Sequence, residues 1–185
     1  AMLFSTLDTT TRALTLDNTQ EILLTDTVGF IRKLPHHLVE AFKSTLEEAK
    51  YADIIIHVVD ASNPQMDEQM YVVYDTLRQL GVEDRPVVTL FNKQDKLERP
   101  VRQRDFRAEY SIPVSAKTGM GLEELKKALL EILRREQIYI ERLYDFSEAG
   151  KIQLIRSRGQ LISEEYVPEG IEVKAYVPKD VYGKI

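Results

Sequence analysis

Three short polar segments of this chain have residue types and spacings that could bind a nucleotide. Each directly follows an apolar run: Asp26-Thr27-Val28-Gly29, Asn92-Lys93-Gln94-Asp95 and Ser115-Ala116-Lys117. A carboxylate such as that of Asp95 can accept two hydrogen bonds from neighbouring N–H groups, as on the N1 and N2 edge of guanine. Adenine lacks this pair of donors, and a site built on such a bond strongly rejects an analogue without them. Asp95 is therefore predicted to select guanine.

The other motif residues have complementary roles in this hypothesis. The Lys93 stem can lie along the flat base, the Asn92 side chain can bridge the loops, and residues 115–117 would bring a backbone N–H to guanine O6. Asp26 would reach a Mg²⁺ ion through water, and Gly29 would let its backbone approach a terminal phosphate without interference from a Cβ. A lone Asp-x-x-Gly or Ser-Ala-Lys fits an ordinary turn equally well, so the prediction depends on all three segments in this order.

The elements expected to position these segments belong to an α/β sheet. The predicted strands are 13–18, 21–26, 53–60, 86–92 and 110–114, and the predicted helices are 36–49, 65–80 and 121–135. The Ile- and Val-rich run 53–60 is typical of a strand covered on both faces, which favours a parallel sheet. Alternating strands and helices indicate a doubly wound α/β domain, whose ligands bind beyond the carboxyl ends of the strands.

The pattern changes at about residue 138. Strands are expected at 139–146, 160–167 and 170–178, with a short helix at 147–157. We therefore predict two domains: residues 1–137 form the α/β domain, and residues 138–185 form a small α+β C-terminal domain.

Composition narrows the class of protein. The 185 residues are 43% hydrophobic and 30% charged, which is typical of a soluble globular protein, and no apolar stretch approaches the roughly 18 residues of a membrane span. The absence of Cys excludes disulfides and Cys-ligated metals and fits a reducing compartment. The net charge of −5 argues against strong nonspecific nucleic-acid binding through overall charge.

The order of the three motifs resembles the third, fourth and fifth motifs of translation-factor-type GTPases. The segment LFSTLDTTTR at residues 3–12 is similar to the switch I segment of the HflX family. Residues 26–49 resemble that family's switch II and following helix, and HVVDAS at 57–62 is also similar. The resemblance covers the whole chain, because the part beyond about residue 139 looks like the family's small C-terminal domain.

The resemblance implies a cytoplasmic GTPase that binds GTP or GDP with Mg²⁺. Such a protein associates with the large (50S) ribosomal subunit and can split stalled ribosomes under stress. Thr6 would contact Mg²⁺ and the terminal phosphate, Asp26 would be linked to Mg²⁺, and Gly29 would sense the phosphate. The residues expected to hold guanine are Asn92, Lys93, Asp95, Ser115, Ala116 and Lys117.

Phe30 occupies the position at which many small GTPases place a Gln that orients the attacking water. A Phe cannot orient water, and the family is similar in having a hydrophobic residue there. Slow intrinsic hydrolysis and activation by a partner, with the ribosome as the natural candidate, are therefore implied, and we assign no catalytic residue in this chain. Phe30 could also simply pack against the switch II segment, and the two interpretations are compatible.

The chain contains no Gly-x-x-x-x-Gly-Lys-Ser/Thr phosphate loop. In the family this loop lies shortly before switch I, where this chain begins. We therefore expect a fragment: a GTPase domain from switch I onward, without its first strand, phosphate loop or N-terminal domain, and deficient in GTP binding. The missing strand would lie between 21–26 and 53–60, so either these strands pair directly or another chain fills the gap in a swapped or edge-paired oligomer.

Two alternative functions remain open at this point. One is a non-catalytic interaction module, which would bind a partner without hydrolysing nucleotide. The other is a GTPase of tRNA modification or ribosome assembly, against which the switch I segment and the C-terminal domain argue.

Overall fold

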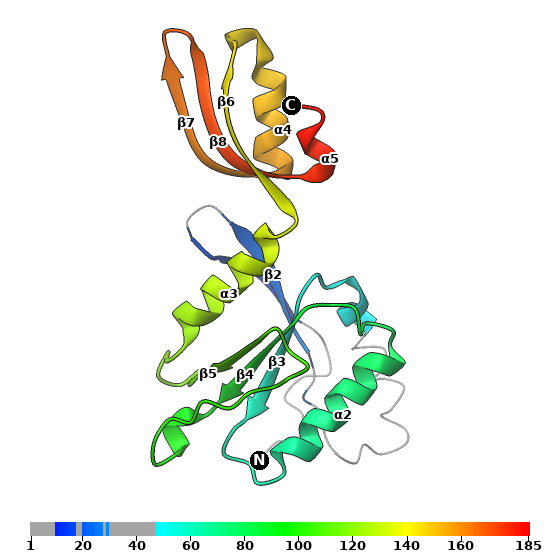
Figure 1. Ribbon diagram of the computed structural model, residues 1–185. Coiled ribbons are helices and arrows are strands. Elements are labelled where there is room, and N and C mark those ends of the chain that lie inside the picture. The colour runs from blue at the N-terminus through cyan, green and yellow to red at the C-terminus, as the bar shows by residue number, and fades with distance from the viewer. Residues whose placement is uncertain (1–9, 18–19, 28, 30–46) are drawn as a thin grey trace. The chain divides into compact units, whose positions relative to one another are not determined.

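A computed structural model describes residues 10–17, 20–27, 29 and 47–185 (Figure 1). By their contacts, these residues form two compact units, one drawn from 10–13 and 23–125 and the other from 14–22 and 126–185. The first part of the chain contains β1 (Thr10–Thr15), β2 (Glu21–Asp26), a 3₁₀ turn (Glu47–Tyr51), β3 (Ile55–Asp60), α2 (Met66–Gln79), β4 (Val87–Asn92), a 3₁₀ turn (Gln94–Lys96) and β5 (Tyr110–Pro113). The remainder contains α3 (Leu122–Arg134), β6 (Gln137–Tyr144), a 3₁₀ turn (Phe146–Glu148), α4 (Ala149–Arg158), β7 (Gln160–Val167), β8 (Gly170–Pro178) and α5 (Lys179–Tyr182).

A parallel sheet in the order β3-β4-β5 forms the centre of the first unit. The β3–β4 register runs from Ile55 opposite Val87 to Asp60 opposite Asn92. The central strand β4 is buried from Val87 to Phe91 and becomes half-buried at Asn92. The predicted α/β class and its parallel sheet are thus confirmed, and the polar ends of the strands share one edge.

Helix α2 packs on this sheet through an apolar stripe. Val73, Leu77 and Val82 form a buried cluster against which Ile55 of β3 also packs. Acidic residues lie in the first turn of the helix and Arg78 lies in the last, as the helix dipole favours.

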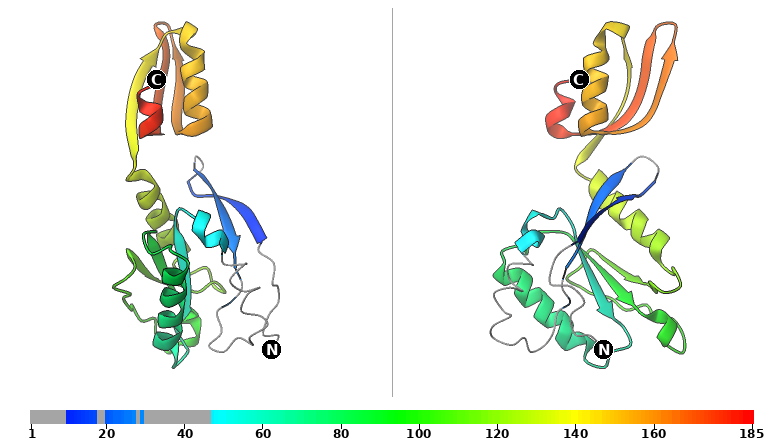
Figure 2. Two further views of the ribbon diagram at one scale, coloured as in Figure 1. Left: turned by 90° about the vertical axis from the view of Figure 1, so that its right-hand side faces the viewer. Right: turned by 180° about the vertical axis from the view of Figure 1, so that it is seen from behind.

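A three-stranded antiparallel sheet, β6-β8-β7, forms most of the second unit. Helices α4 and α5 share one core with it, and both lie on the same face of the sheet (Figure 2). The β7–β8 turn contains Gly170 at φ 151°, and a Cβ there would lie 2.2 Å from the Tyr144 carbonyl oxygen. Only glycine fits this turn, because a side chain would meet backbone at that distance.

The predicted elements agree with the described ones over most of the chain. The strands at 160–167 and 170–178 have the predicted bounds, whereas the predicted strand at 139–146 spans Gln137–Tyr144. The predicted helix 36–49 lies mostly outside the described residues, and its last part is a 3₁₀ turn rather than an α-helix. The short helix α5, near the C-terminus, was not predicted. The proposed division into domains at residue 137 stays a prediction.

Of the two alternatives for the strands at 21–26 and 53–60, direct pairing is not found among the described residues. Strands β2 and β3 do not pair: β2 pairs with β1 in a separate two-stranded sheet, and β3 pairs with β4. The local hairpin already gives β2 a partner, and its turn is held by a hydrogen bond from the Leu16 N–H to the Gln20 carbonyl at 2.8 Å. A hairpin closes a short loop and therefore costs little chain entropy.

We therefore expect the 185-residue chain to self-associate through the outer edge of β3, which has no strand partner among the described residues. Unpaired N–H and C=O groups on an edge strand favour pairing with another chain, and Val58 on this strand is 59% exposed. Val58→Lys should shift the mass measured by light scattering toward the monomer. Tyr166→Lys, at a residue 70% exposed in β7, is the matched control and should change nothing. A wild-type chain that stays monomeric at high micromolar concentration would contradict this expectation.

A buried histidine makes the stability of the first unit sensitive to pH. His57 of β3 is 6% exposed, its ring lies edge-on to Tyr74 at 5.4 Å, and its Nδ1 has no hydrogen-bond partner in the described structure. Burial lowers its pKa from 6.5 to about 4, against a smaller opposing effect of the Asp105 charge. His57 is therefore neutral at pH 7 in the folded chain.

Because the unfolded chain binds the His57 proton more readily, the free energy of unfolding should fall as pH drops from 6.5 to about 4 and level off below that. We expect His57 to contribute about 3 kcal/mol to this loss, on the order of the free energy that corresponds to the lowered pKa. Urea denaturation across this range measures it. His57→Phe keeps the ring and removes the titration, so its stability should fall less over the same range. If the free energy of unfolding fell equally with pH in the wild type and in His57→Phe, His57 would not be the titrating group.

Candidate functional site

The predicted motif residues of β4 and β5 meet at the carboxyl edge of the parallel sheet. The Asn92 Oδ1 accepts a hydrogen bond from the Ala116 N–H at 3.0 Å, and the Ser115 hydroxyl donates to the Asp95 Oδ1 at 2.7 Å. Asn92 thus bridges the two loops, as expected from the sequence. The Ala116 N–H is already engaged by Asn92, so guanine O6 would need a different donor or an exchange of partners.

Asp95 presents an ionised carboxylate to solvent. Asp95 is exposed. The hydrogen bond from Ser115 lowers the pKa of its carboxyl, with smaller contributions in the same direction from Lys117 and Lys96. A carboxylate with two oxygens has several acceptor positions, so the bond from Ser115 leaves it able to accept from a ligand. This is the chemical state that recognition of two N–H donors requires.

Lys93 has the only positive φ among the described residues other than glycine, at φ 67° and ψ 32°. Its ammonium lies 2.6 Å from the Asp60 Oδ2, and the two side chains are 42% and 28% exposed. Ser62 also donates to Asp60, from its N–H at 3.0 Å and its hydroxyl at 2.6 Å. Burial acts to raise the pKa of Asp60, but the bonds from Lys93 and Ser62 together lower it.

The sequence reasoning gave no role to Asp60 or Gln94. Asp60 ends the apolar run of β3 and lies opposite Asn92 in the strand register, so the same strand-end rule could have found it. Gln94 is 2% exposed, although it stands in a run of polar residues. Nothing in its residue type distinguishes it from its exposed neighbours.

The structure describes only part of the predicted phosphate and metal site. Asp26 is exposed at the end of β2, and a Cβ added at Gly29 would meet no atom of the described residues within 4 Å. Thr6 and Phe30 lie outside the described residues. Across the described ranges, no three His, Cys, Asp or Glu residues gather as a metal-binding group, so the Mg²⁺ ligands stay a prediction.

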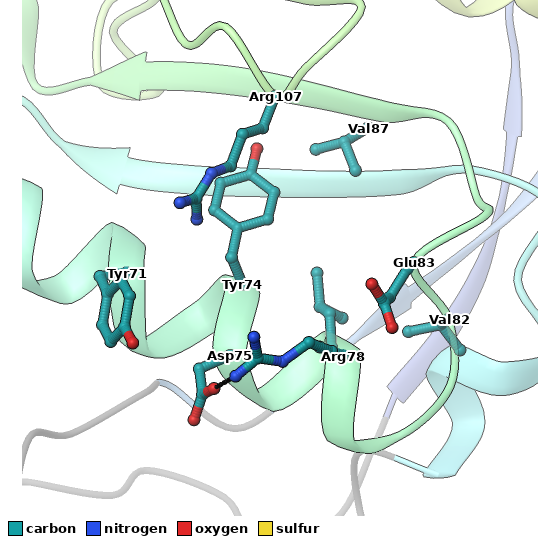
Figure 3. Close-up of a pocket in the computed structure, with 9 residues that line it drawn as sticks. Tyr71, Tyr74, Asp75, Arg78, Val82, Glu83, Val87 and Arg107 are labelled. Carbon is teal, nitrogen blue, oxygen red and sulfur yellow. Dashed lines mark hydrogen bonds and ion pairs between the residues drawn. The ribbon is translucent and has the colours of Figure 1, made fainter.

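A hollow of about 300 Å³ lies beside α2 (Figure 3). Arg107 extends over the Tyr74 ring there, 5.0 Å from its centroid, and Arg78 pairs with Asp75. None of the predicted nucleotide-binding residues lines it. The cations in this hollow have partners within the chain, and we assign it no function.

A parallel sheet with the predicted guanine-binding motifs on its carboxyl edge is typical of a GTPase domain. A family model described as "50S ribosome-binding GTPase" matches residues 1–93. The chain is 61% identical over 99% of its length to GTPase HflX of Lacrimispora saccharolytica, and 44% identical over 97% to that of Caldanaerobacter subterraneus. This chain belongs to the HflX family of GTPases, as the sequence motifs predicted.

The aligned regions are 43% and 41% of those two relatives, so the chain spans about two fifths of their length. A solved GTP-binding protein from Sulfolobus solfataricus, in complex with GDP, superposes with a TM-score of 0.57 and is 30% identical. The match covers 66% of this chain and 43% of that one. Within the described part of the chain, no helix combines the length and hydropathy needed to cross a membrane.

Two serines at this edge allow the electrostatics of the site to be tested. Ser115→Ala should raise the pKa of the Asp95 carboxyl toward its ordinary value, because the hydrogen bond from Ser115 is the main cause of the lowered pKa. Carboxyl ¹³C NMR titration measures this. Ser62→Ala is the matched control: it should raise the pKa of Asp60 and leave that of Asp95 unchanged. An unchanged Asp95 pKa in Ser115→Ala would show that the bond is absent in solution.

Proposed function

We propose that this chain is the guanine-binding portion of a GTP-binding, GTP-hydrolysing factor. The observation that carries the proposal is the exposed Asp95 carboxylate, held by Ser115 beside the Asn92–Ala116 bridge. Asp95 accepts from guanine N1–H and N2–H, and the Lys93 stem lies along the base. Ser115, Ala116 and Lys117 supply the neighbouring loop. The GDP complex of the similar Sulfolobus protein supports a guanine nucleotide as the ligand.

The phosphate side of the proposal involves Thr6, Asp26 and Gly29. Thr6 and Asp26 would hold Mg²⁺, which neutralises charge on the phosphates when bound, and Gly29 would approach the terminal phosphate. Phe30 cannot orient water, so hydrolysis would be slow without an activating partner. The 185 residues contain no phosphate-loop motif, and we infer that they bind nucleotide weakly and are inactive as an isolated polypeptide.

The proposed partner of the whole protein is the large ribosomal subunit. Support comes from the description of the matching family as ribosome-binding and from relatives that share the HflX name. Splitting or rescue of stalled ribosomes in the cytoplasm, under stress, is the activity that we propose for the complete protein.

A non-catalytic interaction module is the second candidate. Nucleotide binding separates the two candidates. A GTPase of tRNA modification is disfavoured, because the similarity to HflX proteins extends over 97–99% of the chain.

We expect GDP at millimolar concentration to shift the backbone amide NMR signals of residues 92–95 and 115–117, whereas ADP should not. Asp95→Asn should abolish the GDP response and create one to xanthosine diphosphate, because xanthine carries an oxygen where guanine has its N2 donors. Glu98→Gln, which removes a nearby exposed carboxylate, is the control and should keep the GDP response.

Equal shifts of these NMR signals with GDP and with ADP would contradict the selection of guanine by residues 92–95 and 115–117. Complete absence of shifts would favour the interaction module. Submicromolar GTP affinity in the presence of Mg²⁺ would contradict the inferred weakness of the isolated chain.

A further inference from the structure

Gln94 is buried in the middle of the segment 92–95, which carries the predicted base-binding residues, and it makes hydrogen bonds to three other parts of the chain. Its amide oxygen accepts from the Val101 N–H at 2.9 Å, and its amide nitrogen donates to the Phe91 carbonyl at 3.1 Å. Its backbone N–H donates to the Val114 carbonyl at 3.2 Å. One residue thus joins the end of β4, the end of β5 and the segment that follows the 3₁₀ turn.

These bonds hold a part of the chain that has an unfavourable local conformation. Lys93, immediately before Gln94, has left-handed backbone angles, which cost a residue with a Cβ about 1–2 kcal/mol. Such a conformation persists only where the surroundings determine it. Gln94 supplies the buried side of those surroundings, and the Asn92 and Ser115 bonds supply the exposed side.

We propose that Gln94 is a positioning residue for guanine recognition: its buried amide holds Lys93 in the left-handed conformation and directs the Asp95 carboxylate toward the base. This inference rests on the proposed guanine site. It adds that base selection depends on a residue that does not touch the nucleotide. Gln94 occupies the position that the motif Asn-Lys-x-Asp leaves unspecified.

The bonding pattern requires a donor and an acceptor in one group of this size. A methionine fills a similar volume and offers neither at useful strength. The Val101 N–H would lose its bond to Gln94, and the Phe91 carbonyl would keep only its bond from the Val114 N–H. A protonated glutamic acid offers both, because its O–H can donate to Phe91 and its C=O can accept from Val101. The ionised form can only accept, and its charge would face a carbonyl oxygen.

The experiment compares Gln94→Met, Gln94→Glu and the control Gln103→Met with the wild-type chain. Gln103 lies in the same connection between β4 and β5, and its amide contacts the Met66 sulfur rather than residues 92–95. Three quantities are measured by NMR: GDP and ADP affinity, the pKa of the Asp95 carboxyl, and the hydrogen-exchange rate of the Val101 amide. The last two need no nucleotide.

In Gln94→Met we expect GDP affinity to fall about tenfold, because without these hydrogen bonds the loop leaves the conformation that binds the base. The Asp95 pKa should rise toward its ordinary value, and the Val101 amide should exchange faster. In GDP affinity and in protection of the Val101 amide from exchange, Gln94→Glu should behave like Gln94→Met at about pH 8 and recover toward wild type at about pH 5, as its carboxyl becomes protonated. Gln103→Met should match wild type throughout.

Unchanged GDP affinity and an unchanged Asp95 pKa in Gln94→Met would overturn the inference and leave Gln94 as a buried spacer. If wild type itself does not respond to GDP, the proposed function fails, and the Asp95 pKa and Val101 exchange still decide whether Gln94 positions the loop. If Gln94→Met does not fold, recovery of Val101 amide protection by Gln94→Glu at low pH decides the same question. Absence of that recovery would contradict the inference.

Discussion

Parallel pairing of β3, β4 and β5 is the constraint on which the candidate site depends. Parallel strands place all their carboxyl ends on one edge, so Asp60, Asn92 and Ser115 become neighbours although they are far apart in the sequence. The register sets Asp60 opposite Asn92, which puts the next residue, Lys93, within reach of the Asp60 carboxylate. The polar edge is therefore a consequence of how the apolar strands pair.

The bonds at this edge position the site without closing it. The Lys93–Asp60 pair is partly exposed, and exposed ion pairs contribute little net stability because water and salt screen them. A base could therefore displace or rearrange such contacts at small cost. The bonds of Gln94 are different, because that side chain is 2% exposed and is therefore shielded from solvent. The buried side of the loop is thus stiff, and the exposed side can adapt to a ligand.

The sequence predicted the elements well where periodicity is strong. The buried run 86–92 and the strands at 160–167 and 170–178 illustrate this, since apolar runs and alternation follow directly from sheet geometry. The motif residues of the base-reading edge were also predictable, because polar residues after apolar strands are conspicuous. Gln94 was not predictable, since only the fold shows that one polar side chain in the run points inward. Direct pairing of 21–26 with 53–60, one of the two alternatives considered, does not occur among the described residues, where β2 pairs with β1.

Asp95 and its neighbours are proposed to bind a guanine base at the carboxyl edge of the sheet. A crystal of the 185-residue chain soaked with GDP would show whether they do. We expect electron density for the base beside the Asp95 carboxylate, with N1 and N2 within hydrogen-bond distance of its two oxygens and the Lys93 stem along the ring. Density for the base elsewhere on the protein, with the Asp95 carboxylate facing only solvent, would contradict it.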